Sequence, residues 1–212
     1  MSRIIAGSHR GRPIVMPSSG RTRPTTDRVR EALFSAIISW AGTSALPAEQ
    51  TLRGLGFCDL FAGSGAVGLE AASRGAAPVL LVENDRKTAL TTNKNVSSLG
   101  LAARVLTTKV EALVRQPAEV GFDVVFADPP YDLGAAAVEA VLTAVVENGW
   151  VAPDGLVVVE RSRRGSDLRW PSGFDGGWSR RYGETMLFFG RADLTGSAAE
   201  TDLHTSPTGQ EA

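Results

Sequence analysis

The sequence has very little cysteine and histidine, and it has no apolar run long enough to cross a membrane. Its one cysteine, Cys58, excludes an internal disulfide and is typical of a reducing compartment. The two histidines, His9 and His204, lie far apart in the chain, so a His/Cys metal site is not expected. No hydrophobic signal segment follows Met1. These absences predict a soluble, cytoplasmic protein with no bound metal and no membrane partner.

The chain also lacks overall charge, but its charges are unevenly distributed. The 212 residues have a net charge of -1, and 43% of them are hydrophobic, which is enough for one core and a small appendage. The first thirty residues contain one acid, Asp27, and these arginines: Arg3, Arg10, Arg12, Arg21, Arg23, Arg28 and Arg30. A basic arm on a near-neutral body indicates an anionic partner on one face, although a solvated terminus gives the same pattern.

The N-terminal residues predict a small hairpin in front of the main domain. Two short β-prone runs, 3–7 and 12–16, lie on either side of a turn. A helix follows an N-cap within 24–27, with its apolar residues from Val29 to Trp40 on one face and Arg28 and Arg30 on the other. We divide the chain into a basic arm at 1–24, a main domain at 25–192 and a tail at 193–212, whose composition predicts disorder.

The stretch from Cys58 to Gly68 predicts the turn of a nucleotide-binding domain. An apolar run at 55–60 indicates a short buried strand, and small residues at 66–73 indicate a helix. The glycines between and within them, Gly63, Gly65 and Gly68, have the spacing G-x-G-x-x-G. Glycines let the backbone approach a ligand closely, and the helix N-terminus supplies unpaired N–H groups. A plain strand-to-helix turn that needs small residues is the alternative.

The rest of the chain alternates strands with helices. A strand at 78–83 ends at Glu83, which lies twenty positions after Gly63, the distance at which a carboxylate binds ribose hydroxyls. Further strands are expected at 103–107, 122–127 and 155–160, helices at 86–98, 110–115 and 138–146, and an antiparallel pair within 180–191. In the first of these helices we expect Ala89, Leu90, Asn93 and Val96 to face inward. The alternation predicts an α/β fold, with a mostly parallel sheet and helices on both faces.

A second motif, Asp128-Pro129-Pro130-Tyr131, closes the strand at 122–127. Ligands of open α/β sheets bind beyond the carboxyl ends of the strands, so this motif is expected beside the glycine turn and Glu83. A carboxylate and the backbone carbonyls can accept hydrogen bonds from the exocyclic amine of a base, while the aromatic ring stacks on the base. A methyl donor in the neighbouring pocket then meets the nitrogen in line, and catalysis is mainly positioning and electrostatics.

These motifs resemble those of S-adenosylmethionine-dependent methyltransferases with a seven-stranded, Rossmann-like sheet. D-P-P-Y is similar to the [DN]-P-P-[YFW] signature of enzymes that methylate amino groups. Further runs resemble the bacterial RsmD family over residues 3 to about 191: RIIAG at 3–7, GR at 11–12, RPTTDRVRE at 23–31, DLFAGSG at 59–65, GLEA at 68–71, SRGA at 73–76 and RYGET at 181–185. The resemblance implies methylation of guanine N2, of the guanine 966 type, in 16S ribosomal RNA within the small ribosomal subunit, by a monomeric protein.

The resemblance also assigns roles to residues. It implies cofactor contacts by Asp59, Phe61, Ala62, Gly63, Ser64, Gly65, Gly68, Glu83, Asn84, Val110 and Asp128, with Glu83 on the ribose. Asp128, Pro129, Pro130 and Tyr131 would hold the target guanine, and Arg3, Arg10, Arg12, Arg21, Arg23, Thr25 and Arg28 would contact RNA. The family often has Asn or Asp followed by Ala near the adenine. This chain has Lys109 and Val110 there, which leaves a backbone contact near Val110.

Three other functions stay open at this point. An NAD-dependent oxidoreductase would use the glycine turn and Glu83, but it gives the D-P-P-Y motif no role. A non-catalytic RNA-binding module would use the arm alone. A methyltransferase acting on adenine N6 in DNA or RNA would keep the same chemistry. Asp128 favours guanine, since guanine presents N1–H and N2–H as adjacent donors to an acceptor-only carboxylate.

Overall fold

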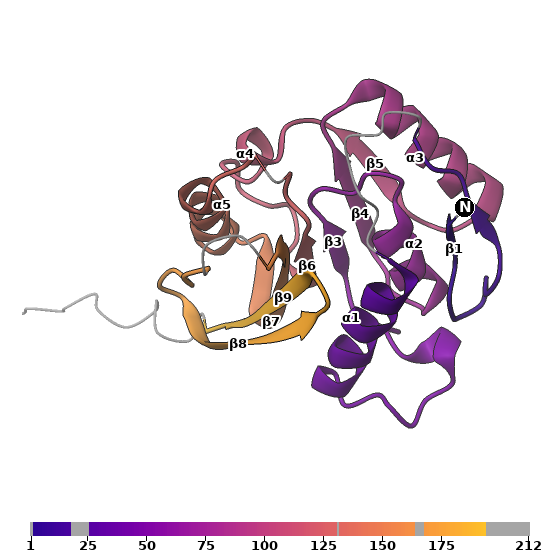
Figure 1. Cartoon of the computed structure of the whole chain (residues 1–212), viewed down its shortest axis with the longest axis horizontal. Helices are drawn as coiled ribbons and strands as arrows, with labels where there is room; N and C mark the ends of the chain where they lie inside the picture. The colour runs from indigo at the N-terminus through magenta and orange to yellow at the C-terminus, as the bar shows by residue number, and fades with distance from the viewer. Residues whose placement is uncertain (1, 18–25, 131, 164–167, 194–212) are drawn as a thin grey trace, which may run out of the picture.

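A seven-stranded sheet forms the centre of the molecule (Figure 1). The computed structural model describes residues 2–17, 26–130, 132–163 and 168–193. The strands are β3 (Phe57–Asp59), β4 (Val79–Glu83), β5 (Arg104–Thr107), β6 (Phe122–Ala127), β7 (Val151–Ser162), β8 (Phe174–Tyr182) and β9 (Thr185–Ala192). They lie in the order β5-β4-β3-β6-β7-β9-β8. The pairs from β5 to β7 are parallel, whereas β9 is antiparallel to both β7 and β8. The predicted mostly parallel sheet with a terminal antiparallel pair is therefore confirmed.

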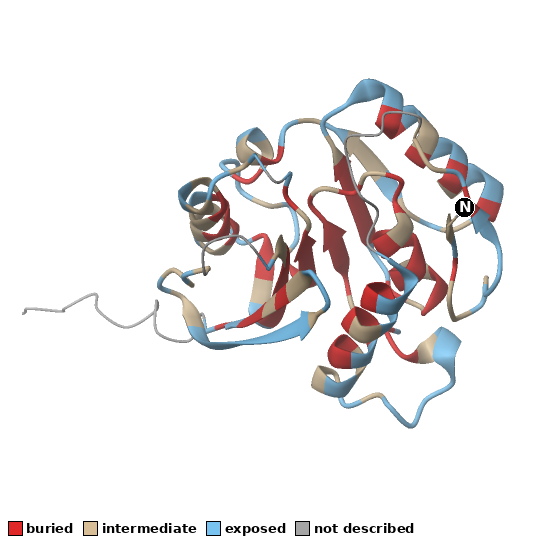
Figure 2. Cartoon of the chain, in the orientation of Figure 1, coloured by how far each residue is buried: buried red, intermediate tan, exposed pale blue. Residues whose placement is uncertain are grey.

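Helices cover both faces of this sheet, as predicted. They are α1 (Asp27–Trp40), α2 (Ala66–Ser73), α3 (Arg86–Leu99), α4 (Val110–Leu113) and α5 (Ala135–Glu147), with a short 3₁₀ turn at Ala48–Gln50. One apolar core lies between the sheet and α1 and α2, and a second lies between the sheet and α4 and α5. Figure 2 shows the strands of the sheet's middle buried and the outward sides of the helices exposed. Among the described residues, no helix is long and apolar enough to span a membrane.

Capping residues set the ends of the two longest helices. The side chain of Thr26 accepts a hydrogen bond from the Val29 N–H at the start of α1, and Asp85 accepts one from the Thr88 N–H at the start of α3. Gly100 ends α3 with a φ of 67°, a backbone conformation that glycine adopts without steric cost. These local signals explain why the sequence places both helices correctly.

The N-terminal hairpin packs against the main domain through buried contacts. Its strands β1 (Ser2–Arg3) and β2 (Pro13–Ile14) pair antiparallel. Ile4 and Ile14 are buried within the core under α1 and α2. The carboxylate of Glu70 in α2 accepts hydrogen bonds from the N–H groups of Ile5 at 2.6 Å and Ala6 at 2.9 Å. The arm thus begins as a fixed part of the body over 2–17, while its boundary at 24 stays a prediction.

Arg30 does not lie on the solvent side of α1, and that prediction is wrong. Its side chain is completely buried. It donates hydrogen bonds to the Arg3 carbonyl at 2.7 Å, to Ser2 Oγ at 3.1 Å and to Asp27 Oδ1 at 2.9 Å. The hairpin folds back over α1 and supplies two of these acceptors, Ser2 Oγ and the Arg3 carbonyl, which the periodicity of the helix alone does not reveal.

The inward face of α3 also differs from the prediction. Ala89 is buried as expected, but Leu90 and Asn93 are exposed. Thr92 and Asn95 are buried in their place, because backbone carbonyls of distant segments accept their hydrogen bonds. Apolar periodicity fails here since the buried face of the helix is polar and hydrogen-bonded.

We expect Glu70→Gln to destabilise the protein by about 3–5 kcal/mol, since it leaves buried Arg74 without its ion-pair partner. Arg74 NH2 lies 2.9 Å from Glu70 Oε1, and Glu70 is completely buried. Urea denaturation measures the change. The control is Glu31→Gln on the exposed side of α1, which should shift the free energy of unfolding by less than about 0.5 kcal/mol. Equal effects of both changes would show that Glu70 contributes no special stability.

Candidate active site

A cleft lies at the carboxyl ends of β3, β4 and β6, where the two sequence motifs meet. The predicted residues that line it are Asp59, Phe61, Ala62, Gly63, Ser64, Glu83, Asn84, Val110, Asp128 and Pro130. Gly65 and Gly68 lie behind this wall, and Pro129 is buried beside it. Tyr131 lies outside the described residues. Asp59 and Asp128, which are far apart in the sequence, thus face one crevice.

Three side chains, from β4 and α3, form hydrogen bonds with the backbone of the glycine turn. The Gly63 N–H donates to Glu83 Oε2 at 3.0 Å. Thr92 Oγ1 donates to the Gly63 carbonyl at 2.6 Å, and Asn95 Nδ2 donates to the Ser64 carbonyl at 2.9 Å. These bonds fix the backbone of the turn before any ligand binds, which is the preorganisation that close recognition requires.

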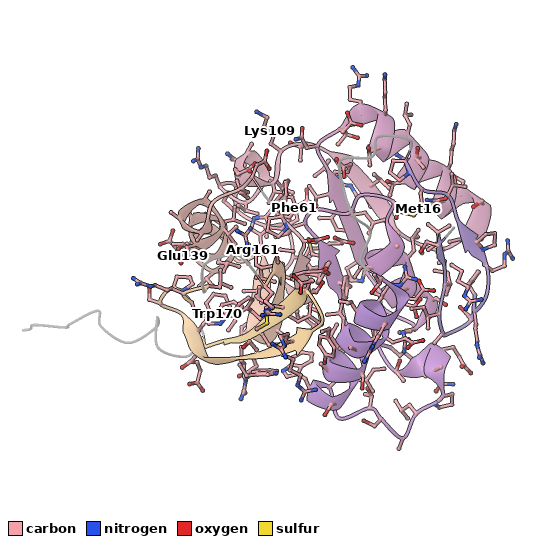
Figure 3. All side chains as sticks on the ribbon, in the orientation of Figure 1. Met16, Phe61, Lys109, Glu139, Arg161 and Trp170 are labelled. Carbon is pink, nitrogen blue, oxygen red and sulfur yellow. The ribbon has the colours of Figure 1, made fainter. Side chains whose placement is uncertain are left out.

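Part of the N-terminal arm forms a wall of the same cleft. Met16 and Pro17 line it, and Figure 3 labels Met16 and, across the cleft, Phe61. Asn95 holds this segment, since its Oδ1 accepts from the Val15 N–H at 2.9 Å and its Nδ2 donates to the Val15 carbonyl at 2.9 Å. The sequence did not indicate these residues as part of the site, because their role depends on a contact between segments eighty positions apart.

Three carboxylates lie on one face of the sheet at the ends of adjacent strands. Side chains alternate between faces along a strand, and Phe126 and Val158 belong to the core on the α1 side. Asp128 and Glu160 each follow two positions later, so they share that face. Asp59, paired in register with Phe126, points the same way. The sheet geometry thus brings three carboxyl groups close together, two of which, Asp59 and Asp128, line the cleft.

Burial strongly affects the protonation of these groups. Burial raises the pKa of Asp59 to about 7, although the hydrogen bond from the Gly68 N–H lowers it. Burial, followed by the charges of Glu160 and Asp59, raises the pKa of Asp128 well above its usual range, while Arg161 lowers it. Burial also raises the pKa of Glu83, although hydrogen bonds from the N–H groups of Asp85 and Gly63 lower it. The cleft is therefore a place where a cation would lower the free energy.

One buried oxygen in the cleft has no hydrogen-bond partner within the described part of the chain. Asp59 Oδ2 accepts a hydrogen bond from the Gly68 N–H at 3.2 Å, but Asp59 Oδ1 has no partner among the described residues. An unpaired buried oxygen costs free energy, and in a native protein it needs an explanation. A positively charged donor in the cleft would satisfy it.

The segment after β5 partly matches its prediction. Val110 begins α4, is buried and lines the cleft together with Glu111. The Lys109 side chain is exposed, and Lys109 is not among the residues that line the cleft.

The loop after Asp128 is supported from β7. Arg161 NH1 donates to the Leu133 carbonyl at 3.0 Å (Figure 3 labels Arg161). Arg161 thereby braces the backbone that follows the D-P-P-Y motif, and no pattern in the sequence indicates this role.

Four of the predicted RNA-contact residues belong to the part of the chain that the structure describes. Arg3, Arg10, Arg12 and Arg28 are exposed, and Arg12 NH2 donates to the Ser98 carbonyl at 3.1 Å. Arg21, Arg23 and Thr25 lie outside the described residues. The exposed arginines surround the hairpin and the start of α1, so they are available to an anionic partner.

Known proteins resemble this chain over nearly its whole described length. Residues 2–191 match the model of the family described as Conserved hypothetical protein 95. The chain is 39% identical over 159 residues to the Escherichia coli protein named Ribosomal RNA small subunit methyltransferase D, covering 74% of this chain and 73% of the relative. It is 36% identical over 165 residues to the Bacillus subtilis protein named Putative rRNA methyltransferase YlbH, covering 76% and 83%.

A solved structure agrees. The structure described as putative methyltransferase yhhF from Escherichia coli has a TM-score of 0.75 and 31% identity, covering 90% of this chain and 97% of that one. Together with the matching family model, these similarities show that the chain belongs to the Conserved hypothetical protein 95 family, the RsmD family.

Proposed function

We propose that this protein transfers a methyl group from S-adenosylmethionine to the exocyclic N2 amine of one guanine in 16S ribosomal RNA. Membership of the RsmD family supports activity as an rRNA methyltransferase. The observation that carries the proposal is the cleft in which Asp59 of the glycine turn and Asp128 of the D-P-P-Y motif meet on one face of the sheet. A nucleotide cofactor bound at the glycine turn beside Asp59 would meet a base held by the D-P-P-Y motif at Asp128.

The residues of the cleft fit this cofactor. Asp59 Oδ1, buried and without a partner among the described residues, suits the positively charged amino group of the methionine part. Glu83 already accepts hydrogen bonds from the N–H groups of Gly63 and Asp85, and each carboxylate oxygen keeps capacity for a ribose hydroxyl. Val110 would contact the adenine. A solved Thermus thermophilus 16S rRNA N2 methyltransferase, described as a complex with AdoMet and guanosine, shares the fold at a TM-score of 0.62 and 24% identity.

S-adenosylmethionine, when bound, supplies a methyl group on a positively charged sulfur. Asp128 and the carbonyl of Pro129 accept hydrogen bonds from the two N–H groups of the amine, so the nitrogen lone pair turns toward the methyl group. With the amine held by Asp128 and Pro129, the cofactor would supply the methyl group to the nitrogen, and its sulfur would leave as a neutral thioether with the electron pair of the S–C bond. The nitrogen then releases one proton, which Asp128 accepts because burial has raised its pKa.

The carboxylate of Asp128 favours guanine over adenine. Guanine offers adjacent N1–H and N2–H donors, whereas adenine offers one donor and one acceptor at the corresponding edge. Methylation of adenine N6 is therefore the second candidate, and it differs from the first only in the product.

Mass spectrometry of ribosomal RNA from a strain lacking this protein tests the proposal. One N2-methylguanine of the 16S RNA should be absent and should return when the gene is restored. Loss of an N6-methyladenine would favour the second candidate. A calorimetric titration that detected NAD binding but no S-adenosylmethionine binding would support an oxidoreductase, and RNA binding without methyl transfer would leave only a binding module.

Substitutions at Asp128 and Glu83 should affect different steps, methyl transfer and cofactor binding respectively. We expect Asp128→Ala to reduce methyl transfer on the order of 100-fold or more, since it removes a charge-assisted hydrogen bond at the reacting amine. Cofactor affinity measured by calorimetry should stay close to that of the wild type. Glu83→Ala should instead weaken cofactor binding first. Equal loss of cofactor binding in the Asp128 variant, or an unchanged dissociation constant in the Glu83 variant, would contradict these roles.

Cofactor affinity should increase with pH. Asp59, with a pKa of about 7, is mostly protonated at pH 6 and mostly ionised at pH 8, and only the ionised form attracts the cation. The dissociation constant should therefore be about tenfold lower at pH 8 than at pH 6. Glu83 and Asp128, whose pKa values burial also raises, would add to the slope, so the diagnostic comparison is Asp59→Asn, which should bind weakly with a shallower dependence. A wild-type dissociation constant that is independent of pH would exclude Asp59 as the partner.

The arm should contribute electrostatically to RNA binding. Arg10→Ala and Arg12→Ala together should lower the slope of log affinity against log salt, by roughly 0.7 to 0.9 for each phosphate that is no longer neutralised. Melting temperature should change little because both side chains are exposed. Arg104→Ala, which removes an exposed arginine of the edge strand β5, is the control. Parallel salt plots for the double variant and the wild type would mean that neither arginine contacts the phosphate backbone.

A further inference from the structure

The β8–β9 hairpin carries exposed side chains that no part of the proposed site uses. Glu160 of β7 pairs in register with Leu187 of β9, and Leu187 pairs with Arg180 of β8. Residues paired across strands project from the same face of a sheet, so Arg180 shares the face of Glu160 and, one strand further, of Asp128. Strands are about 4.8 Å apart, which places Arg180 roughly 14 Å from Asp128 across the sheet. A few nucleotides of extended RNA span this distance.

An aromatic ring lies next to Arg180 on this face. Trp178 pairs in register with Phe189, and their rings stack with centroids 5.0 Å apart and planes 5° apart. Phe189 is completely buried, whereas Trp178 is 40% exposed. One face of the indole therefore packs against a buried ring that holds its orientation, while part of the side chain remains exposed to solvent. A fixed, exposed aromatic ring is a platform on which a base of single-stranded nucleic acid stacks.

Charge around the hairpin tip favours an anionic partner. Arg180 and Arg181 are exposed. Arg163, at the end of β7, is also exposed, and its NH1 lies 3.6 Å from Glu184, which is the one acid in the described part of the tip from 180 to 185. The cations therefore exceed the acids there, beside the end of the sheet that carries the cleft.

We propose that Trp178 and Arg180 form a second RNA-contact surface, which binds single-stranded nucleotides next to the target guanine. Trp178 stacks on a base, and Arg180 contacts a phosphate. This inference deepens the proposed function and rests on it, since the target guanine is what lies at Asp128. The arm and the hairpin would then hold the RNA on opposite sides of the cleft, with the base to be methylated between them.

Arg181 provides a matched control on the same strand. It pairs in register with Met186, which places it on the opposite face of the sheet from Arg180. Both arginines are exposed and adjacent in sequence, so they differ mainly in the face from which they project. Arg104→Ala, at the far edge of the sheet, controls for the loss of one positive charge.

The test measures RNA binding and methyl transfer separately, on protein-free 16S RNA from a strain that lacks the enzyme. We expect Arg180→Ala to lower the salt slope of binding by about 0.7, the value for one contact with single-stranded RNA, and to leave the KM for the cofactor unchanged. Arg181→Ala and Arg104→Ala should keep the wild-type slope. Equal slopes for Arg180→Ala and wild type, or equal effects of Arg180→Ala and Arg181→Ala, would overturn the assignment of this face.

Trp178 needs a second pair of variants because its ring also covers Phe189. Trp178→Leu should weaken RNA binding about tenfold with no change in salt slope, since stacking is not a charge interaction. Trp178→Phe should restore most of the affinity, because it keeps a flat ring. If both variants lose affinity equally and melt equally early, Trp178 is only a structural residue and the proposal fails.

Two further outcomes separate this inference from the proposed function. Wild-type protein that binds the RNA but transfers no methyl group, either to protein-free RNA or to assembled small subunits, would refute the proposed function, and the salt slopes would still decide on the hairpin. Variants that bind free RNA like the wild type but fail on assembled subunits would overturn the RNA surface and assign the hairpin to a protein partner.

Discussion

The structure depends on the close approach of the start of α2 to β4 and α3, which leaves no room for a side chain at Gly65 or Gly68. A Cβ at Gly68 would overlap the side chain of Leu81, and one at Gly65, whose φ is 80°, would press on Thr92. With glycine at both positions, α2 packs directly against β4, and the turn comes within reach of α3. Thr92 and Asn95 of α3 can then hold the carbonyls of Gly63 and Ser64. The absence of side chains at Gly65 and Gly68 therefore allows the close packing that fixes the wall of the cleft.

The side chain of Asn95 also links the cleft to the arm. The amide of Asn95 bonds Ser64 on one side and Val15 on the other. An amide side chain can serve both, since it carries two donors and an acceptor. Nearer the start of the arm, the buried side chains of Glu70 and Arg30 bind its backbone by charge-assisted hydrogen bonds. Residues 2–17 thus position Met16 and Pro17 as part of the cleft rather than as a separate module.

The fold and most of the site could be predicted from the sequence. Apolar runs such as 79–83 and 122–127 mark buried strands, and parallel connection brings their carboxyl ends together, which is why Glu83 and Asp128 meet. The burial of Arg30 and Asn95 could not be predicted, because each is held by hydrogen bonds to a segment far away in the chain. A helical pattern reports apolar faces only, so a polar face that is buried by such partners is assigned to solvent.

The distribution of charge explains how an RNA substrate would meet this site. Asp59 and Asp128 line the cleft with carboxyl groups, and their ionised forms repel phosphates. The exposed arginines lie outside it, at the hairpin of the arm and on β8. RNA phosphates would therefore bind at the exposed arginines on the two sides of the cleft. The group that enters the cleft between them would have to be uncharged. In the proposed reaction an unpaired base would meet this condition, because it brings no phosphate into the cleft, and the two carboxyl groups would contact its amine.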